Sequence, residues 1–181
     1  QNGEGMPQQP VTFKAYPVER FIQIVKAWAN HPWPMTPDEG RQLYESLGYK
    51  TDDTDRDMFS SPFAKGEPDS FFTRTGNTIA DIVIAVGERY TVEEEDSCIE
   101  AVTRAYEEYC GAVDASFIGA VDSRQKTSDA MEWFLNNGVQ IRIDNVGIMV
   151  SLTLHSPRMT QLRREEEEIG LTDYDDFLED D

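Results

Sequence analysis

The sequence predicts an α+β fold, in which a single domain holds an antiparallel sheet with helices mainly on one face, in the order ααββαβββα. Apolar residues recur at helical spacing near the N-terminus, and apolar and polar residues alternate between positions 139 and 155. Gly, Asn and Pro mark turns between these segments. With 181 residues, 39% of them hydrophobic, the chain is long enough to bury a core without disulfides or a metal.

Two helices that form a hairpin are expected first. The first helix is indicated by apolar residues one helical turn apart: Val18, Phe21, Ile22, Val25 and Trp28. It ends at residues 31–34, because two prolines within this segment cannot continue a helix. Thr36 is the N-cap of the second helix, with Pro37 at its first position and Glu39 completing a capping box. Gly48 suits the position just after its end.

The next segment, residues 50–70, is polar and rich in Asp, Ser, Pro and Gly, which predicts a long loop. Phe71 and Phe72 begin a strand that turns at Gly76. Residues 78–86 are β-branched on both faces, which is typical of a central strand.

A third helix is predicted over residues 97–110, following the acidic residues 93–96, which stabilise the N-terminal end of a helix. Its buried side is expected to consist of residues with helical spacing: Ile99, Val102, Ala105, Tyr106 and Tyr109.

Three strands and a last helix complete the prediction. The strands are expected within residues 132–135, 139–144 and 148–155, and alternation in the last two gives one apolar and one mostly polar face. Pro157 closes the sheet, and residues 158–169 predict a helix that runs into the acidic end of the chain.

The domain boundaries follow from composition. Residues 1–10 have neither the basic start nor the apolar core of a signal peptide. They are expected to be disordered and to include an expression remnant, with Met6 as the native start. Residues 11–170 form the single α+β domain, and residues 171–181 form an acidic tail. Residues 1–10 and 172–181 have too little apolar surface to offset the entropy of ordering, so both are expected to be mobile.

The net charge of −19 is the feature that most limits the function. Residues 165–181 carry ten carboxylates and no Lys or Arg, which leaves a net charge of −9 on residues 1–164. A surface this negative repels nucleic acid and anionic lipid, and it attracts basic protein surfaces. No apolar run is long enough to span a membrane. We therefore expect a cytoplasmic protein with a basic protein partner, and no nucleic acid or membrane.

No catalytic residue is predicted. The sequence lacks a dinucleotide-binding fingerprint, a phosphate-binding loop, a nucleophile elbow and zinc-ligand spacing. His31 lies in a proline-rich turn and His155 at the end of a strand, so they do not suggest a catalytic pair. The 35 acidic residues make chance carboxylate pairs abundant, so none can be singled out.

Metal and cofactor sites are not predicted either. Residues 53–57 resemble the opening of a calcium loop, but Met58 replaces the required Gly and Ala64 the bidentate Glu. Cys98 and Cys110 are expected to be free thiols, because twelve residues along one helix separate them too far to bridge. The three tryptophans are expected to pack in the core: Trp28, Trp33 and Trp133.

Two acidic clusters are the candidate partner-binding residues. They consist of Asp52, Asp53, Asp55 and Asp57 in the long loop, and of Glu93, Glu94, Glu95 and Asp96 before the third helix. Charge runs are often only solvated surfaces. The long loop favours a role in binding, because such a segment in a compact domain is commonly functional or disordered.

A resemblance adds to this interpretation. Residues 21–49 have the spacing Phe-x3-Val-x2-Trp, followed by Trp-Pro-x-Thr and Leu-x3-Leu-Gly-Tyr, with a later Trp133–Gly138 hairpin and a terminal Arg-Arg-x-Glu helix. This layout resembles the small acidic actinobacterial immunity proteins that include the immunity factor for tuberculosis necrotizing toxin. The resemblance implies a cytosolic antitoxin that covers the active site of a secreted, NAD-cleaving toxin. No inhibitory residue is carried over from that family.

The sequence therefore favours a non-enzymatic immunity protein that blocks a toxin with a basic surface around its active site. The first alternative is an acidic DNA mimic that inhibits a nucleic-acid-binding protein, which requires carboxylates in regular rows. The second is an enzyme that uses only carboxylates, which the missing motifs make the least favoured.

Overall fold

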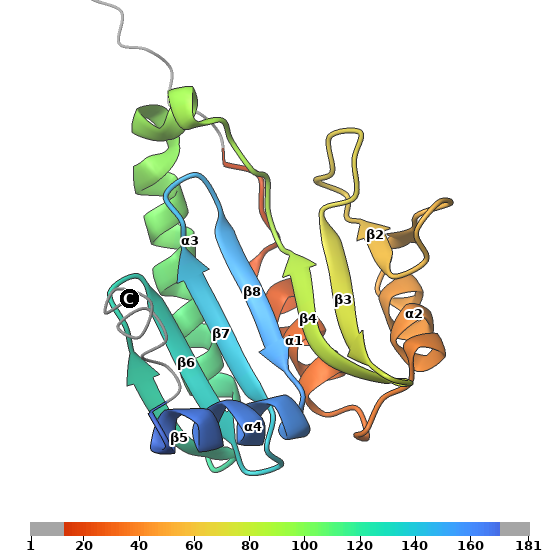
Figure 1. Cartoon of the computed structure of the whole chain (residues 1–181). Helices are drawn as coiled ribbons and strands as arrows, with labels where there is room; N and C mark the ends of the chain where they lie inside the picture. Colours follow the sequence, from red (N-terminus) through yellow and green to blue (C-terminus); the bar gives the residue numbers. More distant parts are fainter. Residues whose placement is uncertain (1–12, 171–181) are drawn as a thin grey trace, which may run out of the picture.

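The computed structural model describes residues 13–170, which fold around one antiparallel sheet (Figure 1). Its eight strands lie in the order β1-β2-β3-β4-β8-β7-β6-β5, and every neighbouring pair is antiparallel. The strands are β1 (Lys50–Thr51), β2 (Met58–Ser60), β3 (Ser70–Thr75), β4 (Thr78–Ala85), β5 (Val121–Lys126), β6 (Ala130–Leu135), β7 (Gln140–Asn145) and β8 (Val150–His155).

Helices cover the two faces of this sheet unequally. They are α1 (Val18–Ala29), α2 (Pro37–Ser46), α3 (Glu95–Ser116) and α4 (Pro157–Glu168), and a 3-10 turn, η2 (Val92–Glu94), precedes α3. In Figure 1, α1 and α3 lie behind the sheet, while α4 crosses the lower end of the front face. The α+β prediction with helices mainly on one face is confirmed. None of the helices within residues 13–170 is long and apolar enough to cross a membrane.

The core lies between the sheet and the helices behind it. Val150, Leu152 and Leu154 of β8 are buried, whereas the residues between them are only partly buried, which confirms the predicted alternation. Trp28 and Trp133 are fully buried, as expected, whereas Trp33 is only partly buried and packs against the core. The helices also pack on each other: the rings of Phe21 and Tyr109 stack with centroids 3.8 Å apart, which joins α1 to α3.

Local sequence signals account for the ends of α2. Thr36 and Glu39 form the predicted capping box, in which the Glu39 amide donates to Thr36 Oγ1 and the Thr36 amide donates to Glu39 Oε1. Pro37 occupies the first position, where its missing N–H removes no helical hydrogen bond. Gly48 has φ of +91°, so a residue without Cβ is favoured there.

Three strands were not predicted. β1 and β2 lie within the expected loop of residues 50–70, and their two and three residues are too few to show a periodic pattern. β5 is an edge strand whose side chains are mostly exposed, so it has no apolar alternation, and only its backbone pairing with β6 defines it. α3 is longer than predicted and reaches Ser116.

The terminal predictions lie outside the described residues. They comprise the disordered remnant at residues 1–10, the acidic tail at residues 171–181, and the mobility of residues 1–10 and 172–181.

Candidate protein-binding surface

The aspartates of the first acidic cluster mainly hold their own loop together. The Asp52 carboxylate accepts hydrogen bonds from the amides of Thr54 and Asp55 at 3.1 and 2.8 Å, and Asp55 accepts one from the Asp57 amide at 3.0 Å. Asp57 receives two hydrogen bonds from Arg74, at 2.9 and 2.8 Å. In residues 13–170, only Asp53 of this cluster is exposed without a partner.

In the second acidic cluster, two carboxylates contact the rest of the protein and two are exposed to solvent. Glu94 accepts hydrogen bonds from the amide and the hydroxyl of Thr91 as part of a capping box, and these bonds hold its pKa below the usual range. Glu95 lies against Gly147, whose missing Cβ leaves space for the carboxylate. Glu93 and Asp96 are exposed and have no hydrogen-bond or ion-pair partner in the described chain. They are the two carboxylates of this cluster that remain available to a partner.

The structure does not bring the two clusters together. The loop of residues 52–57 lies beside α2 at one side of the molecule, whereas residues 93–96 lie at the upper end of α3 at the other side (Figure 1). The eight predicted partner-binding residues therefore do not form one continuous acidic patch.

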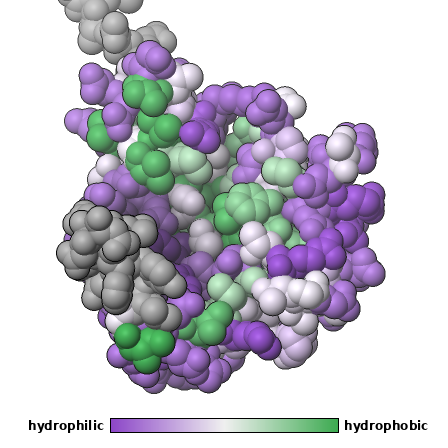
Figure 2. All heavy atoms as spheres, in the orientation of Figure 1, coloured by the Kyte–Doolittle hydropathy of each residue, from purple (hydrophilic) through white to green (hydrophobic). Residues whose placement is uncertain are grey.

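Large apolar side chains are exposed next to the second cluster. Val92 is 73% exposed, Ile99 42% and Val146 51%. The prediction that Ile99 lies on the buried side of its helix is therefore wrong, because α3 turns this side chain to solvent. Figure 2 shows apolar residues at this end of the molecule, with hydrophilic residues around them.

Contacts between α3 and the β7–β8 turn place Ile99 near Val146. Glu95 lies against Gly147, and the Asn145 side-chain amide donates to Thr103 Oγ1 at 3.1 Å. Ile99 lies one helical turn from both Glu95 and Thr103, and Val146 lies between Asn145 and Gly147. We call the exposed side chains at this end of α3 the α3 patch: Ile99 and Val146, Val92 of the turn that precedes the helix, and the acids Glu93, Asp96 and Glu100.

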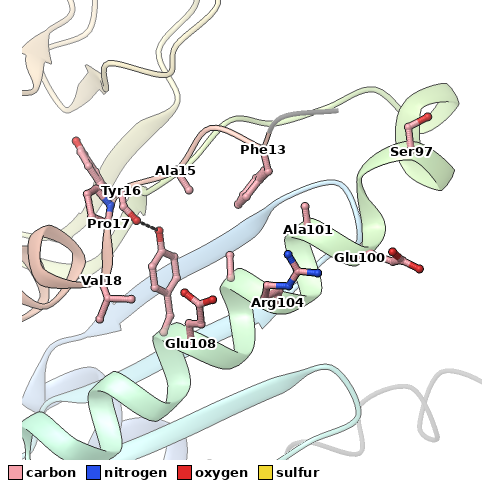
Figure 3. A pocket seen from close by; sticks show the side chains of 12 residues that line it. Phe13, Ala15, Tyr16, Pro17, Val18, Ser97, Glu100, Ala101, Arg104 and Glu108 are labelled. Carbon is pink, nitrogen blue, oxygen red and sulfur yellow. Dashed lines mark hydrogen bonds between the residues drawn. The ribbon is translucent and has the colours of Figure 1, made fainter. Parts of the chain in front are cut away.

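The solvent side of α3 continues beyond this patch as a hollowed surface. A 460 Å³ groove separates α3 from the segment Phe13–Val18, and Figure 3 shows Glu100, Arg104 and Glu108 along it. The Tyr109 hydroxyl donates to the Tyr16 carbonyl at 2.6 Å and fixes the segment to the helix. A shallower hollow of 340 Å³ lies beside Ile99. The groove and the hollow could each accept a side chain of a binding partner.

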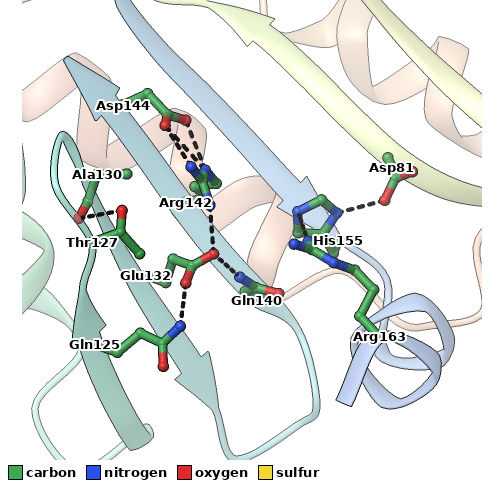
Figure 4. A network of polar contacts seen from close by, with 10 residues as sticks. All are labelled: Asp81, Gln125, Thr127, Ala130, Glu132, Gln140, Arg142, Asp144, His155 and Arg163. Carbon is green, nitrogen blue, oxygen red and sulfur yellow. Dashed lines mark hydrogen bonds and ion pairs between the residues drawn. The ribbon is translucent and has the colours of Figure 1, made fainter. Parts of the chain in front are cut away.

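A polar network centred on the buried side chain of Glu132 lies on the front face of the sheet (Figure 4). Glu132 is buried and accepts hydrogen bonds from Gln125, Gln140 and Arg142 at 2.6, 2.7 and 2.8 Å. Burial alone would raise the pKa of Glu132, but the hydrogen bonds from Gln125 and Arg142 and the positive charge of Arg142 outweigh it and hold the pKa below its usual range. Arg142 also binds Asp144, at distances of 2.9 to 3.1 Å.

His155 has the positioned partners that the sequence did not reveal. Arg163 of α4 donates to His155 Nε2 at 2.6 Å, so Nδ1 carries the proton and donates to Asp81 at 2.5 Å. Burial would raise the pKa of Asp81, but the hydrogen bonds from His155 and Thr73 hold it below its usual range. Because Arg163 occupies Nε2, this ring has no nitrogen open to take a proton from a substrate. The chain of contacts from Arg163 through His155 to Asp81 holds α4 against the sheet.

The two cysteines and His31 lie in surroundings that do not suggest catalysis. Cys98 and Cys110 are free and buried, as expected, and burial raises the pKa of Cys110 to about 11, which keeps its thiol protonated. His31 donates from Nδ1 to the Pro32 carbonyl at 2.8 Å. No group of three or more His, Cys, Asp or Glu side chains within residues 13–170 is arranged to hold a metal ion.

Asp81, Glu132, Ile99 and Val146 are not among the site residues that the sequence predicts. Asp81 and Glu132 could have been noticed as single charged residues inside otherwise apolar strands. Ile99 and Val146 carry no such signal, because exposure depends on which elements cover a side chain.

Comparison with known proteins identifies the family of this chain, but the family has no known function. Residues 19–156 match the model of a protein family described as a family of unknown function (DUF6301). No curated protein and no solved structure shows a significant match.

Proposed function

The chain belongs to this family of unknown function, DUF6301, and from its surface chemistry we propose that it is a non-enzymatic immunity protein. It would bind and block a toxin in the cytoplasm. The α3 patch is the observation that supports this proposal. Exposed aliphatic side chains next to unpaired carboxylates are suited to a partner whose surface is apolar at its centre and basic around it. The resemblance in sequence extends the proposal to a secreted, NAD-cleaving toxin with a basic surface around its active site.

The charge of the domain supports fast association with such a partner. Residues 13–170 contain 28 acidic and 16 basic side chains. Long-range attraction raises the association rate, whereas buried aliphatic contacts slow dissociation. The division of roles gives two separate predictions, one for apolar and one for charged residues of the α3 patch.

Replacing Ile99 and Val146 together with alanine is expected to weaken toxin binding about 100-fold, mainly through faster dissociation, because central apolar contacts dominate binding energy. The matched control is Ile118→Ala. Ile118 is 84% exposed but lies just after the other end of the same helix. Binding is measured by surface plasmon resonance against the partner toxin, and protection by growth of cells that express both proteins. Equal binding by the double variant and the parent would refute the α3 patch as the interface.

Neutralising Glu93 and Asp96 as Glu93→Gln and Asp96→Asn is expected to slow association about threefold or more at low salt and to flatten its salt dependence. Dissociation and folding should change little, because neither carboxylate has a partner in the described chain. Asp53→Asn serves as the control in the other cluster, since it removes a charge without disturbing the loop. Neutralising all four loop aspartates together would be less informative, because Asp52, Asp55 and Asp57 hold the loop. A larger effect from Asp53→Asn would move the interface to that loop.

An acidic DNA mimic remains the alternative. Asp96, Glu100 and Glu107 follow one side of α3 and provide a short row of carboxylates, but Arg104 lies within that row. Competition by duplex DNA distinguishes the two functions. DNA would displace a nucleic-acid-binding partner from a mimic, whereas a toxin bound at the α3 patch would stay bound. A carboxylate-based enzyme has the least support, because Glu132 and Asp81 are both fully engaged with neighbouring side chains.

A further inference from the structure

A larger hollow lies at the end of the sheet opposite the α3 patch. Its volume is about 760 Å³, which is within the range of small-molecule sites. Four segments meet around it: the loop of residues 30–34, the β3–β4 turn, the β6–β7 turn and the first turn of α4. The α3 patch includes the turn at the other end of β7, so the two surfaces are separated by the length of that strand.

The walls of this hollow are largely apolar and rigid. Trp33, Pro34, Ile79, Pro157 and Met159 contribute ring, aliphatic and thioether surface. Proline rings have fixed backbone angles, and Ile79 is held in the core. An apolar group that enters this space therefore meets a preformed surface, and little entropy is lost in ordering the protein around it.

The charge around this hollow is unlike that of the rest of the molecule. None of its lining residues is acidic, and they include the cation Arg158. Four other hollows on residues 13–170 are each lined by at least two glutamates. In a domain with 28 acidic residues, a lining without a carboxylate favours a ligand that is itself negative.

Arg158 offers two donors at one point. Its guanidinium has no hydrogen-bond or ion-pair partner in the part of the chain that the structure describes. Its main-chain N–H is also open in the first turn of α4. Pro157 has no N–H, the Met159 amide donates to Ser156 Oγ at 3.1 Å, and the Thr160 amide donates to the Ser156 carbonyl at 2.9 Å. A guanidinium and an N–H at a helix N-terminus together suit a carboxylate.

Trp33 adds an unpaired donor to the apolar wall. Its indole Nε1 is buried and has no hydrogen-bond partner within residues 13–170. A buried donor without an acceptor is uncommon in folded proteins. The ring itself is partly exposed and lines the hollow, so its N–H signal can report on a ligand that binds there.

We propose that this hollow binds a small organic carboxylate with an apolar body, whose head group lies at Arg158 and whose body lies against Trp33 and Met159. The ligand is either a free carboxylic acid or the C-terminal carboxylate of a peptide with an apolar last residue. This site is independent of toxin binding, because the α3 patch lies at the other end of the sheet.

Titration with 4-phenylbutyrate tests the proposal, and 4-phenylbutan-1-ol is the matched ligand without charge. The readout is the indole N–H signal of Trp33 in nitrogen-15 NMR spectra, assigned by its loss in Trp33→Phe. A saturable shift with a dissociation constant in the millimolar range or tighter is expected for the acid. The alcohol and the Arg158→Gln variant should each bind about tenfold or more weakly, because a charge-assisted hydrogen bond is lost.

Arg56→Gln is the control, because Arg56 is an exposed arginine on the β1–β2 loop and should leave binding unchanged. N-acetyl-alanyl-phenylalanine separates the two ligand sources, and its C-terminal amide is the matched peptide without charge. Tighter binding of the free peptide acid than of phenylbutyrate identifies a chain terminus, and the reverse identifies a free acid. The proposal is overturned if phenylbutyrate causes no saturable shift, or if the alcohol binds as tightly as the acid.

Discussion

Replacement of Trp28 with alanine is expected to lower the free energy of unfolding by about 3–5 kcal/mol, because it opens a large cavity in a part of the core that cannot collapse easily. Trp28 is fully buried, and its ring meets Tyr44 edge to face with centroids 4.7 Å apart. Tyr44 in turn donates to the Val83 carbonyl at 2.6 Å and stacks on Phe59. The cavity would therefore lie where α1, α2 and the sheet meet.

Urea unfolding followed by circular dichroism measures this loss. Trp28→Phe is the informative companion, since Trp28 Nε1 has no hydrogen-bond partner among the described residues. Phenylalanine keeps most of the ring and sacrifices no hydrogen bond, so it should cost clearly less than alanine. Ile118→Ala should stay within about 0.5 kcal/mol of the parent, as expected for an exposed residue. A Trp28→Ala protein as stable as that control would contradict the position of α1 on the sheet.

The second large effect is expected from Glu132→Ala, which should lower the free energy of unfolding by about 3 kcal/mol near neutral pH. The substitution leaves the Gln125 and Gln140 amides without their acceptor and removes one of the two carboxylates that bind Arg142. Asp144 remains paired with Arg142, which keeps the cost at the lower end of the range for broken buried ion pairs.

The pH dependence of this effect has a defined sign. Because folding lowers the pKa of Glu132, its ionised form stabilises the folded state fully above the unfolded-state pKa of about 4.3. That contribution is lost as the pH falls below this value and through the folded-state pKa. The stability difference between the parent and Glu132→Gln should therefore narrow below about pH 4, since glutamine resembles the protonated acid. A difference that stays constant from pH 7 to pH 3 would show that Glu132 is not held in its ionised form.

Local patterns in the sequence were sufficient for most of the fold. The capping box of Thr36 and Glu39 involves residues three positions apart, and the alternation in residues 148–155 depends only on the two-residue period of a strand. Such signals are complete within a few residues, so they do not require knowledge of distant contacts. β5 was missed for the same reason, because its backbone pairing with β6 is its defining feature.

The amino-acid sequence by itself determined the α+β class, the burial of Trp28 and Trp133, and the strongly negative charge. Tertiary structure alone decided which charged and apolar side chains remain available to a partner. Asp57 is held by Arg74, seventeen positions away, whereas Asp53 in the same loop is free. Ile99 and Val146 share a surface because the β7–β8 turn docks on α3. Availability depends on contacts between residues far apart in the chain, and composition and periodicity carry no record of those contacts.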